Sequence, residues 1–271
     1  MFSARSVHGA EMEYWKYSGA GNDFVLLDNR SDALSDYPSL AKRLCDRENG
    51  IGADGLIILE NPMGGGDVRM AFFNNDGSAA EMCGNGARCL CRHCFDMGIS
   101  GPQQKLETPA GMVYGERLAE NLYRIQLNRP SETVLQMEVN ESLCDYVVLG
   151  VNGIPHAAVS ADLSANRAIL RDFARNLRYA DTFPKGANIN LYTIVDRNHI
   201  LLLTYERGVE DFTLACGTGT GATVYALYKR GLVRGINTRV DVDGGRLFVD
   251  IENGEIYLSG PADLITHGNI E

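Results

Sequence analysis

The chain contains two matching segments, Cys83-Gly84-Asn85-Gly86 and Cys216-Gly217-Thr218-Gly219. A helix-like stretch follows each cysteine and ends at a glycine the same number of residues later. A cysteine at a helix start lies where unpaired backbone N–H groups converge and where the helix dipole is positive. Such a site stabilises a thiolate, so we expect the thiol pKa to fall from about 8.5 to around 7 or lower.

The chemistry of the pair follows if the two sites face each other. Small glycines let a ligand approach the backbone, whose N–H groups can hold a carboxylate. One thiolate and one thiol on opposite sides of a Cα can remove a proton from one face and return it on the other. The two segments therefore predict racemisation or epimerisation of an amino acid without pyridoxal phosphate. For a single copy, a tight turn with a buried cysteine would be the better interpretation.

The similarity between the two halves extends beyond the cysteines. Asn74 and Arg207 each lie nine residues before their cysteine. Asn22 and Asn188 each precede a strand-like run, so we align them as equivalents. Downstream, hairpin-like stretches follow over residues 110–125 and 244–258. These matches predict two homologous units, and the length of the chain also allows two domains.

Apolar runs and turn signals predict both strands and helices in each half. We expect one long helix per unit with strands wrapped around it, which is a mixed α+β class. The polar stretch 128–132 is the expected linker between the units. The expected helices span 39–46, 86–97, 170–179 and 219–229, and the expected strands span 24–27, 56–59, 68–73, 146–148, 191–195, 200–204, 239–242 and 247–251.

The composition disfavours several classes of protein. With 45% hydrophobic and 22% charged residues, the chain has enough apolar material for two cores. No apolar run approaches the roughly 18 residues that cross a bilayer. The net charge of −10 disfavours a nucleic-acid or anionic-membrane surface, because phosphate binding requires a basic face. Residues 1–11 lack a secretory pattern, so we interpret them as an extension of unknown role and expect a cytoplasmic protein.

The seven cysteines are an odd number in a chain without a secretory pattern, which favours reduced thiols over a disulfide framework. Cys89, Cys91 and Cys94 together with His93 suggest a zinc site. On a helix, however, these side chains point in different directions, and a second ligand pair is missing. We therefore expect no metal and interpret Cys94 as a residue of the buried helix face.

Two further interpretations concern the matching segments. A dithiol redox or metal-binding protein would use Cys83 and Cys216 as a pair, but it would leave the upstream polar residues without a task. The spacing Gly217-x-Gly219-x-x-Ala222 imitates a dinucleotide fingerprint. No clear strand precedes these glycines, so we expect no nucleotide cofactor.

Short motifs of small and polar residues are spread along the chain. They are Ser18-Gly19-Ala20-Gly21-Asn22-Asp23-Phe24, Gly52-Ala53-Asp54-Gly55, Asn74-Asn75-Asp76-Gly77-Ser78, Met82-Cys83-Gly84-Asn85-Gly86-Ala87-Arg88-Cys89, Pro155-His156, Ala187-Asn188-Ile189, Tyr205-Glu206-Arg207-Gly208 and Ala215-Cys216-Gly217-Thr218-Gly219. In this order they resemble the diaminopimelate epimerases of bacterial lysine and peptidoglycan biosynthesis. The resemblance implies two pseudosymmetric α/β domains, each with a mostly antiparallel sheet wrapped around a central helix, and a site in the cleft between them. The first domain would comprise residues 12–126 and 262–271, and the second would comprise 127–261.

The resemblance also implies roles for particular residues. Cys83 and Cys216 would be the two acid/base residues. Backbone N–H groups of Gly84, Asn85, Gly217 and Thr218 would bind the carboxylate at the reacting centre. The substrate-binding side chains would be Asn22, Asn74, Asn188, Arg207 and Glu206, the last of which would take or orient the reacting ammonium group. The expected partners are a small amino-acid substrate and, in a homodimer, a second copy of the chain.

Two positions depart from the family pattern. Ile154 stands where many members have asparagine, so an amide expected at the distal end of the substrate is absent. Gly55 replaces a glutamine found in some members. Epimerisation of LL-diaminopimelate to the meso form is the leading hypothesis, and a racemase for another amino acid on the same scaffold is the alternative. Arg88 is expected to support the first helix start, and His156 is expected to be structural.

Overall fold

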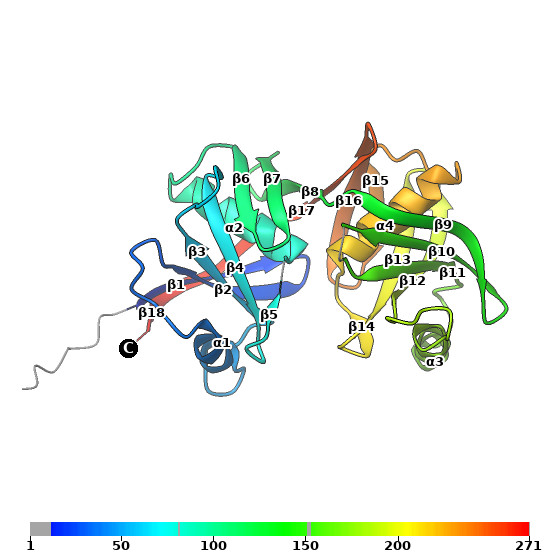
Figure 1. Cartoon of the computed structure of the whole chain (residues 1–271), viewed down its shortest axis with the longest axis horizontal. Coiled ribbons are helices and arrows are strands. Elements are labelled where there is room, and N and C mark those ends of the chain that lie inside the picture. The colour runs from blue at the N-terminus through cyan, green and yellow to red at the C-terminus, as the bar shows by residue number, and fades with distance from the viewer. Residues whose placement is uncertain (1–11, 81, 151–152, 271) are drawn as a thin grey trace, which may run out of the picture.

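The computed structural model describes residues 12–80, 82–150 and 153–270. The extension over residues 1–11 and the terminal residue of the expected first domain, Glu271, lie outside this range. The described chain forms two lobes that lie side by side (Figure 1). One mixed sheet of 18 strands runs through both lobes.

The first lobe contains two helices and the N-terminal strands. Its helices are α1 (Tyr37–Cys45) and α2 (Gly84–Asp96). Its strands are β1 (Met12–Gly19), β2 (Asn22–Asp28), β3 (Gly55–Glu60), β4 (Val68–Asn74), β5 (Ala79–Ala80), β6 (Gln103–Thr108), β7 (Gly111–Arg117) and β8 (Leu122–Leu127). The last strand of the chain, β18 (Asp263–Ile270), returns to this lobe and pairs with β1.

The second lobe repeats this plan. Its helices are α3 (Arg167–Arg178) and α4 (Gly217–Lys229). Its strands are β9 (Pro130–Val139), β10 (Ser142–Leu149), β11 (Pro155–Ser160), β12 (Asn188–Asp196), β13 (His199–Glu206), β14 (Asp211–Thr213), β15 (Thr238–Val242), β16 (Gly245–Glu252) and β17 (Glu255–Pro261).

The two lobes have the same strand pairing. In the first, β2 and β3 are parallel, β3 and β4 are antiparallel, and β4 and β6 are parallel. In the second, β11 and β12, β12 and β13, and β13 and β15 pair in the same three senses. The central helices α2 and α4 occupy equivalent places in the chain order, each just before the second parallel partner. The α+β class with two pseudosymmetric halves is thus confirmed.

One part of the predicted repeat is wrong. Sequence similarity aligned Asn22 with Asn188, but Asn22 begins β2 and Asn188 begins β12. By pairing, β2 corresponds to β11, whereas β12 corresponds to β3. Strand equivalence is set by distant pairing partners, which a short local motif does not encode.

The predicted linker is shorter than expected. Strand β8 ends at Leu127 and β9 begins at Pro130. Proline has no N–H to give to the ladder, so in strands it is confined to places such as the first residue, where Pro130 lies. Residues 130–132 therefore belong to the sheet, and only Asn128 and Arg129 separate the two lobes at this point.

The largest apolar core spans both lobes. Helix α2 is buried along most of its length, as is α4, and one apolar cluster joins both helices through Ile125 and Leu127 of β8 and Ile256 and Leu258 of β17. Strands β8 and β17 pair antiparallel, so the sheet continues across the junction. Two smaller clusters lie under α1 and α3. The junction fixes the starts of α2 and α4 relative to each other. Among the described residues, no helix combines the length and apolar character needed to cross a membrane.

Candidate active site

Each of the two candidate cysteines caps a central helix. Cys83 has extended backbone angles, φ −128° and ψ 116°, and its Sγ accepts a hydrogen bond from Gly86 N at 3.5 Å. Cys216 repeats this geometry with φ −113° and ψ 107°, and its Sγ accepts from Gly219 N at 3.4 Å. Both helices begin two residues before the expected starts, so the cysteines are the N-caps.

The two helix starts meet across the junction of the lobes. A Cβ placed on Gly217 would lie 3.8 Å from the Cα of Gly84 and 3.8 Å from Oδ1 of Asn85. The side-chain amide of Asn85 also donates to the carbonyl of Ala215, the residue before Cys216, at 3.4 Å. Backbone N–H groups at two positive helix ends therefore lie close together, which is a favourable arrangement for a carboxylate.

The thiols do not have the lowered pKa values that the sequence predicted. Burial raises the pKa of Cys83, although the N–H groups of Gly86 and Asn85 and the charge of Arg88 oppose the rise. Burial also raises the pKa of Cys216, and the Glu206 carboxylate adds to that rise. Loss of water around a thiolate outweighs the helix ends here.

Three of the expected residues surround Cys216 with their side chains, and a fourth, Arg207, is held beside them through its backbone. The amide Nδ2 of Asn188 lies 3.9 Å from Sγ, and the hydroxyl of Thr218 lies 3.6 Å from it. The amide oxygen of Asn188 accepts from Arg207 N at 2.8 Å. Burial raises the pKa of Glu206, whose oxygen accepts from the Thr213 hydroxyl at 2.6 Å. The Glu206 carboxylate, the Asn188 amide and the Thr218 hydroxyl therefore lie around one thiol, and the Asn188 amide oxygen holds the backbone of Arg207.

Asn22 and Asn85 lie on the Cys83 side of the junction. The amide of Asn85 donates to Oδ1 of Asn22 at 2.7 Å, and the amide of Asn22 donates to Oδ2 of Asp54 at 3.0 Å. Because a carboxylate can only accept, Asp54 determines which way the Asn22 amide points. One N–H of that amide is left free for a ligand.

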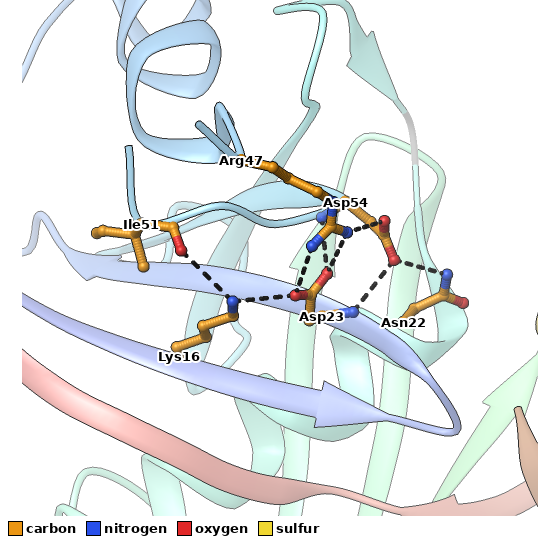
Figure 2. A network of polar contacts seen from close by, with 6 residues as sticks. All are labelled: Lys16, Asn22, Asp23, Arg47, Ile51 and Asp54. Carbon is orange, nitrogen blue, oxygen red and sulfur yellow. Dashed lines mark hydrogen bonds and ion pairs between the residues drawn. The ribbon is translucent and has the colours of Figure 1, made fainter. Parts of the chain in front are cut away.

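Asp54 belongs to the polar network that Figure 2 shows. Arg47 bridges Asp54 and Asp23, at 2.7 and 2.8 Å, and Lys16 pairs with Asp23 at 3.1 Å. This network joins the start of β2 to the start of β3. Asp54 is not among the site residues predicted from the sequence, although its motif Gly52-Ala53-Asp54-Gly55 is part of the family resemblance.

Among the described residues, the hydrogen bonds of Asn74 connect it to its own turn and not to either cysteine. Its amide donates to the Ser78 hydroxyl at 2.9 Å, and its backbone N–H donates to the Ser78 carbonyl at 2.8 Å. Both bonds shape the turn between β4 and β5, which leads the chain toward Cys83. Asn74 is therefore held in place by its own turn, at the end of β4.

His156 lies beneath the second helix start. It is buried, its Nδ1 lies 3.4 Å from the amide of Asn190, and burial lowers its pKa to about 3. A Cβ on Gly219 would approach this nitrogen to 3.3 Å. A neutral imidazole packed under the backbone agrees with the structural role expected for it.

Comparisons with known proteins identify the family to which this sequence belongs. The sequence profile described as Diaminopimelate epimerase matches residues 14–126 and 149–265. The chain belongs to the diaminopimelate epimerase family. A diaminopimelate epimerase of Aquifex aeolicus is 35% identical, over 96% of this chain and 98% of the relative. One from Flavobacterium psychrophilum is 36% identical, over 94% and 98%.

Solved structures extend the likeness beyond the diaminopimelate epimerase family. A probable proline racemase from Agrobacterium radiobacter K84 superposes with a TM-score of 0.71 at 15% identity, over 96% of this chain and 93% of that one. A hydroxyproline epimerase from Agrobacterium vitis gives 0.66 at 14% identity, over 97% and 91%. At these identities the likeness concerns the fold, and the family assignment comes from the sequence.

Proposed function

We propose that the protein is an isomerase that interconverts LL- and meso-diaminopimelate without pyridoxal phosphate, using Cys83 and Cys216 as its two acid/base residues. The observation that carries the proposal is the meeting of two cysteine-capped helix starts, with Gly84 and Gly217 in close approach. Membership of the diaminopimelate epimerase family supports the choice of substrate.

The proposed reaction moves one proton across the substrate Cα. The thiolate of one cysteine takes the α-proton and becomes a thiol, while the thiol of the other cysteine gives its proton to the opposite face and becomes a thiolate. The pair ends a turnover with its protonation reversed. During the step, negative charge grows on the substrate carboxylate, and the N–H groups of Gly84, Asn85, Gly217 and Thr218 would stabilise it.

The remaining side chains would bind the substrate's charged groups. Glu206 would take the reacting ammonium group, since it is an acceptor beside Cys216. The guanidinium of Arg207 donates to the Lys185 carbonyl at 2.6 Å, and its other N–H groups would pair with a carboxylate. The free N–H of Asn22 would donate to a carboxylate oxygen, and Asn74 and Asn188 would complete the amide set.

A racemase for another amino acid is the second candidate, and Ile154 is the observation that favours it. Its side chain is 43% exposed just before β11, whose next residues run beside Asn188. An apolar side chain cannot replace the hydrogen bonds of an amide, and an unmatched buried polar group costs about 1–3 kcal/mol. The distal end of the substrate is therefore where the two candidates differ.

Incubation of the purified protein with LL-diaminopimelate in D₂O tests the proposal. Formation of the meso isomer with deuterium at the α-carbon is the expected result. A parallel panel of other amino acids, each followed by chiral separation, separates the two candidates. Turnover of another amino acid with none of diaminopimelate would move the assignment to the racemase.

We place the domain bounds at residues 12–126 with 262–271, and at 127–261, because β18 returns to pair with β1. We assign the protein to the cytoplasm, where its thiols would stay reduced.

We also propose a homodimer, in which a second copy would cover Leu264 and Ile265 of β18, now 45% and 53% exposed. Sedimentation equilibrium showing only monomer would contradict the dimer.

A further inference from the structure

Arg88 is a buried cation that pairs with no anion in the described part of the chain. It is 0% exposed and is the largest of the fully buried side chains. Among the described residues, no carboxylate pairs with it or is among the charges that act on it, and its Nη1 has no hydrogen-bond partner. A buried charge is normally paired, because its loss of water is otherwise uncompensated. A negative charge that is present in the working protein is therefore expected near this guanidinium.

Its contacts hold the guanidinium at the first helix start. Nη2 donates to Oδ1 of Asn85 at 2.9 Å, and Nε donates to the Pro261 carbonyl at 3.4 Å. A Cβ on Gly260 would lie 3.0 Å from Cζ, so β17 covers the group closely. Asn85 is the second residue of the helix that Cys83 caps. The cation is thus fixed within the turn that follows this thiol.

The second unit has no such cation. The residue five positions after Cys216 is Gly221, where Arg88 stands five positions after Cys83. Leu127 occupies the space that a side chain at Gly221 would need, because a Cβ there would lie 2.4 Å from its Cδ1. The pseudosymmetry of the two helix starts is therefore broken at this position.

The two thiols consequently face charges of opposite sign. The Glu206 carboxylate raises the pKa of the Cys216 thiol and so favours its protonated form, and the Thr213 hydroxyl holds that carboxylate in place by donating to it at 2.6 Å. Cys83 is acted on by Arg88 from its own helix and by Glu206 from β13. The titratable groups that act on Arg88 are the thiols of Cys83, Cys89 and Cys91. Of these, Cys89 and Cys91 are fully buried.

We infer that Arg88 is a positioning residue that holds the negative charge of the cysteine pair on Cys83 in the resting protein, while Glu206 keeps the proton on Cys216. The inference rests on the proposed function in that the two cysteines share one proton. It adds that the pair is not symmetric when it is empty. Arg88 acts through Asn85 and through its charge, without contact to the substrate.

The test measures the ionisation of each thiol without any substrate. The protein is alkylated with iodoacetamide at a series of pH values, and the pH at half-maximal rate is read for each cysteine. Trypsin places Cys83 in the peptide Met70–Arg88 and Cys216 in Gly208–Lys229, and each peptide contains no other cysteine. Because the midpoint does not depend on how accessible a thiol is, the different burial of the two residues does not disturb the comparison. In the wild type, Cys83 is expected to have the lower midpoint.

Arg88→Met should raise the midpoint of Cys83 by one pH unit or more. Cys89 and Cys91 then share its tryptic peptide, so fragment ions assign the label. Arg92→Met is the matched control. Arg92 is on the same helix, donates to the neighbouring Ala262 carbonyl and carries the same charge, but pairs with Asp96. Its replacement should leave the midpoint unchanged.

Arg88→Lys keeps the charge and should keep the lower midpoint at Cys83. It also decides the matter if Arg88→Met unfolds, which labelling of the buried Cys144 would reveal. The inference would be overturned if Cys216 had a lower midpoint than Cys83, either in the wild type or in folded Arg88→Lys. An unchanged Cys83 midpoint in folded Arg88→Met would do the same. Absence of epimerisation with these midpoints intact would instead count against the proposed function alone.

Discussion

The side-chain amide of Asn85, in the first lobe, donates a hydrogen bond to the main-chain carbonyl of Ala215 in the second. The two residues are 130 positions apart in the sequence. Each lies next to a helix start that a cysteine caps, so this bond fixes one helix start against the other. Asn85 also donates to Asn22 and accepts from Arg88, so both N–H groups of its side chain are used within the protein. We therefore assign its contact with the substrate to the backbone N–H.

Gly219→Ala should damage the second helix start. The new Cβ would lie 2.5 Å from the amide oxygen of the buried Asn190 and 3.2 Å from Sγ of Cys216. We expect the free energy of unfolding to fall by about 1–3 kcal/mol, as overpacking commonly does. Epimerase activity should fall more than a hundredfold, about the contribution of one positioned acid/base group. Gly101→Ala, where the space is open, is the control for both measurements.

Asp54→Asn should weaken the site through Asn22. The NH₂ group of the new amide would face either the Arg47 guanidinium or the N–H groups of Asn22 and Asp23. All of these groups are donors, so the hydrogen bonding on that side would be lost. We expect a loss in kcat/KM smaller than that of Asn22→Ala. The double variant should lose no more than Asn22→Ala alone, because both changes act on one amide. Strictly additive losses would show that Asp54 acts elsewhere.

Glu206→Gln should shift the pH dependence of turnover. The carboxylate raises the pKa of Cys216 and also that of Cys83, so its removal lowers both. The bell-shaped profile of kcat/KM, which reports the coupled pair, should therefore move toward lower pH. Its height should fall, because the ammonium acceptor is lost. Full profiles in both proteins, measured with the same substrate, are needed to separate the shift from the loss.

Stability should fall in mild acid because two histidines are buried in the neutral state. Burial lowers the pKa of His93 to about 4 and that of His156 to about 3, against about 6.5 in an unfolded chain. Below pH 6.5 the unfolded state binds more protons, so each histidine removes up to about 1.4 kcal/mol per pH unit until its folded pKa is reached. Above pH 6.5 both histidines are mostly neutral in the folded and in the unfolded protein, so this loss of stability disappears.

Urea denaturation at pH 7.5 and 5.0 measures this effect. His93→Phe removes one titrating group from the folded interior and should make the free energy of unfolding less dependent on pH. His267, which is half exposed beside Glu13, is the control position, and His267→Phe should leave the dependence on pH close to that of the wild type. An equal dependence on pH in all three proteins would contradict the assignment.

The local parts of the site were predictable because they are written in consecutive residues. Each cysteine is followed at once by glycines and then by a helical pattern, so both caps and both central helices were found. The parallel and antiparallel order of the strands was not. This order of strand pairing shows that Asn188 corresponds to the start of β3 and not to Asn22.

The contacts that support the site could not be predicted from the sequence either, because they join residues that are far apart in the chain. Asp54 reaches Asn22 across 32 positions, and their meeting depends on the register of β2 against β3. The thiol pKa values were mispredicted because a helix start is visible in the sequence, whereas the depth at which it is buried is not. Arg88 was expected to support a helix start, and its contact with Asn85 agrees with that, but its lack of an anion became visible only in the fold.

The most direct test of the central claim is the rate of epimerisation by Cys83→Ser and Cys216→Ser. A serine hydroxyl keeps the size and the hydrogen bond to the helix but cannot ionise near neutral pH. The account predicts that each variant loses activity by roughly three orders of magnitude or more, within reach of a single acid/base group, while Cys144→Ser retains it. Near wild-type turnover of diaminopimelate by either of the first two variants would contradict the account.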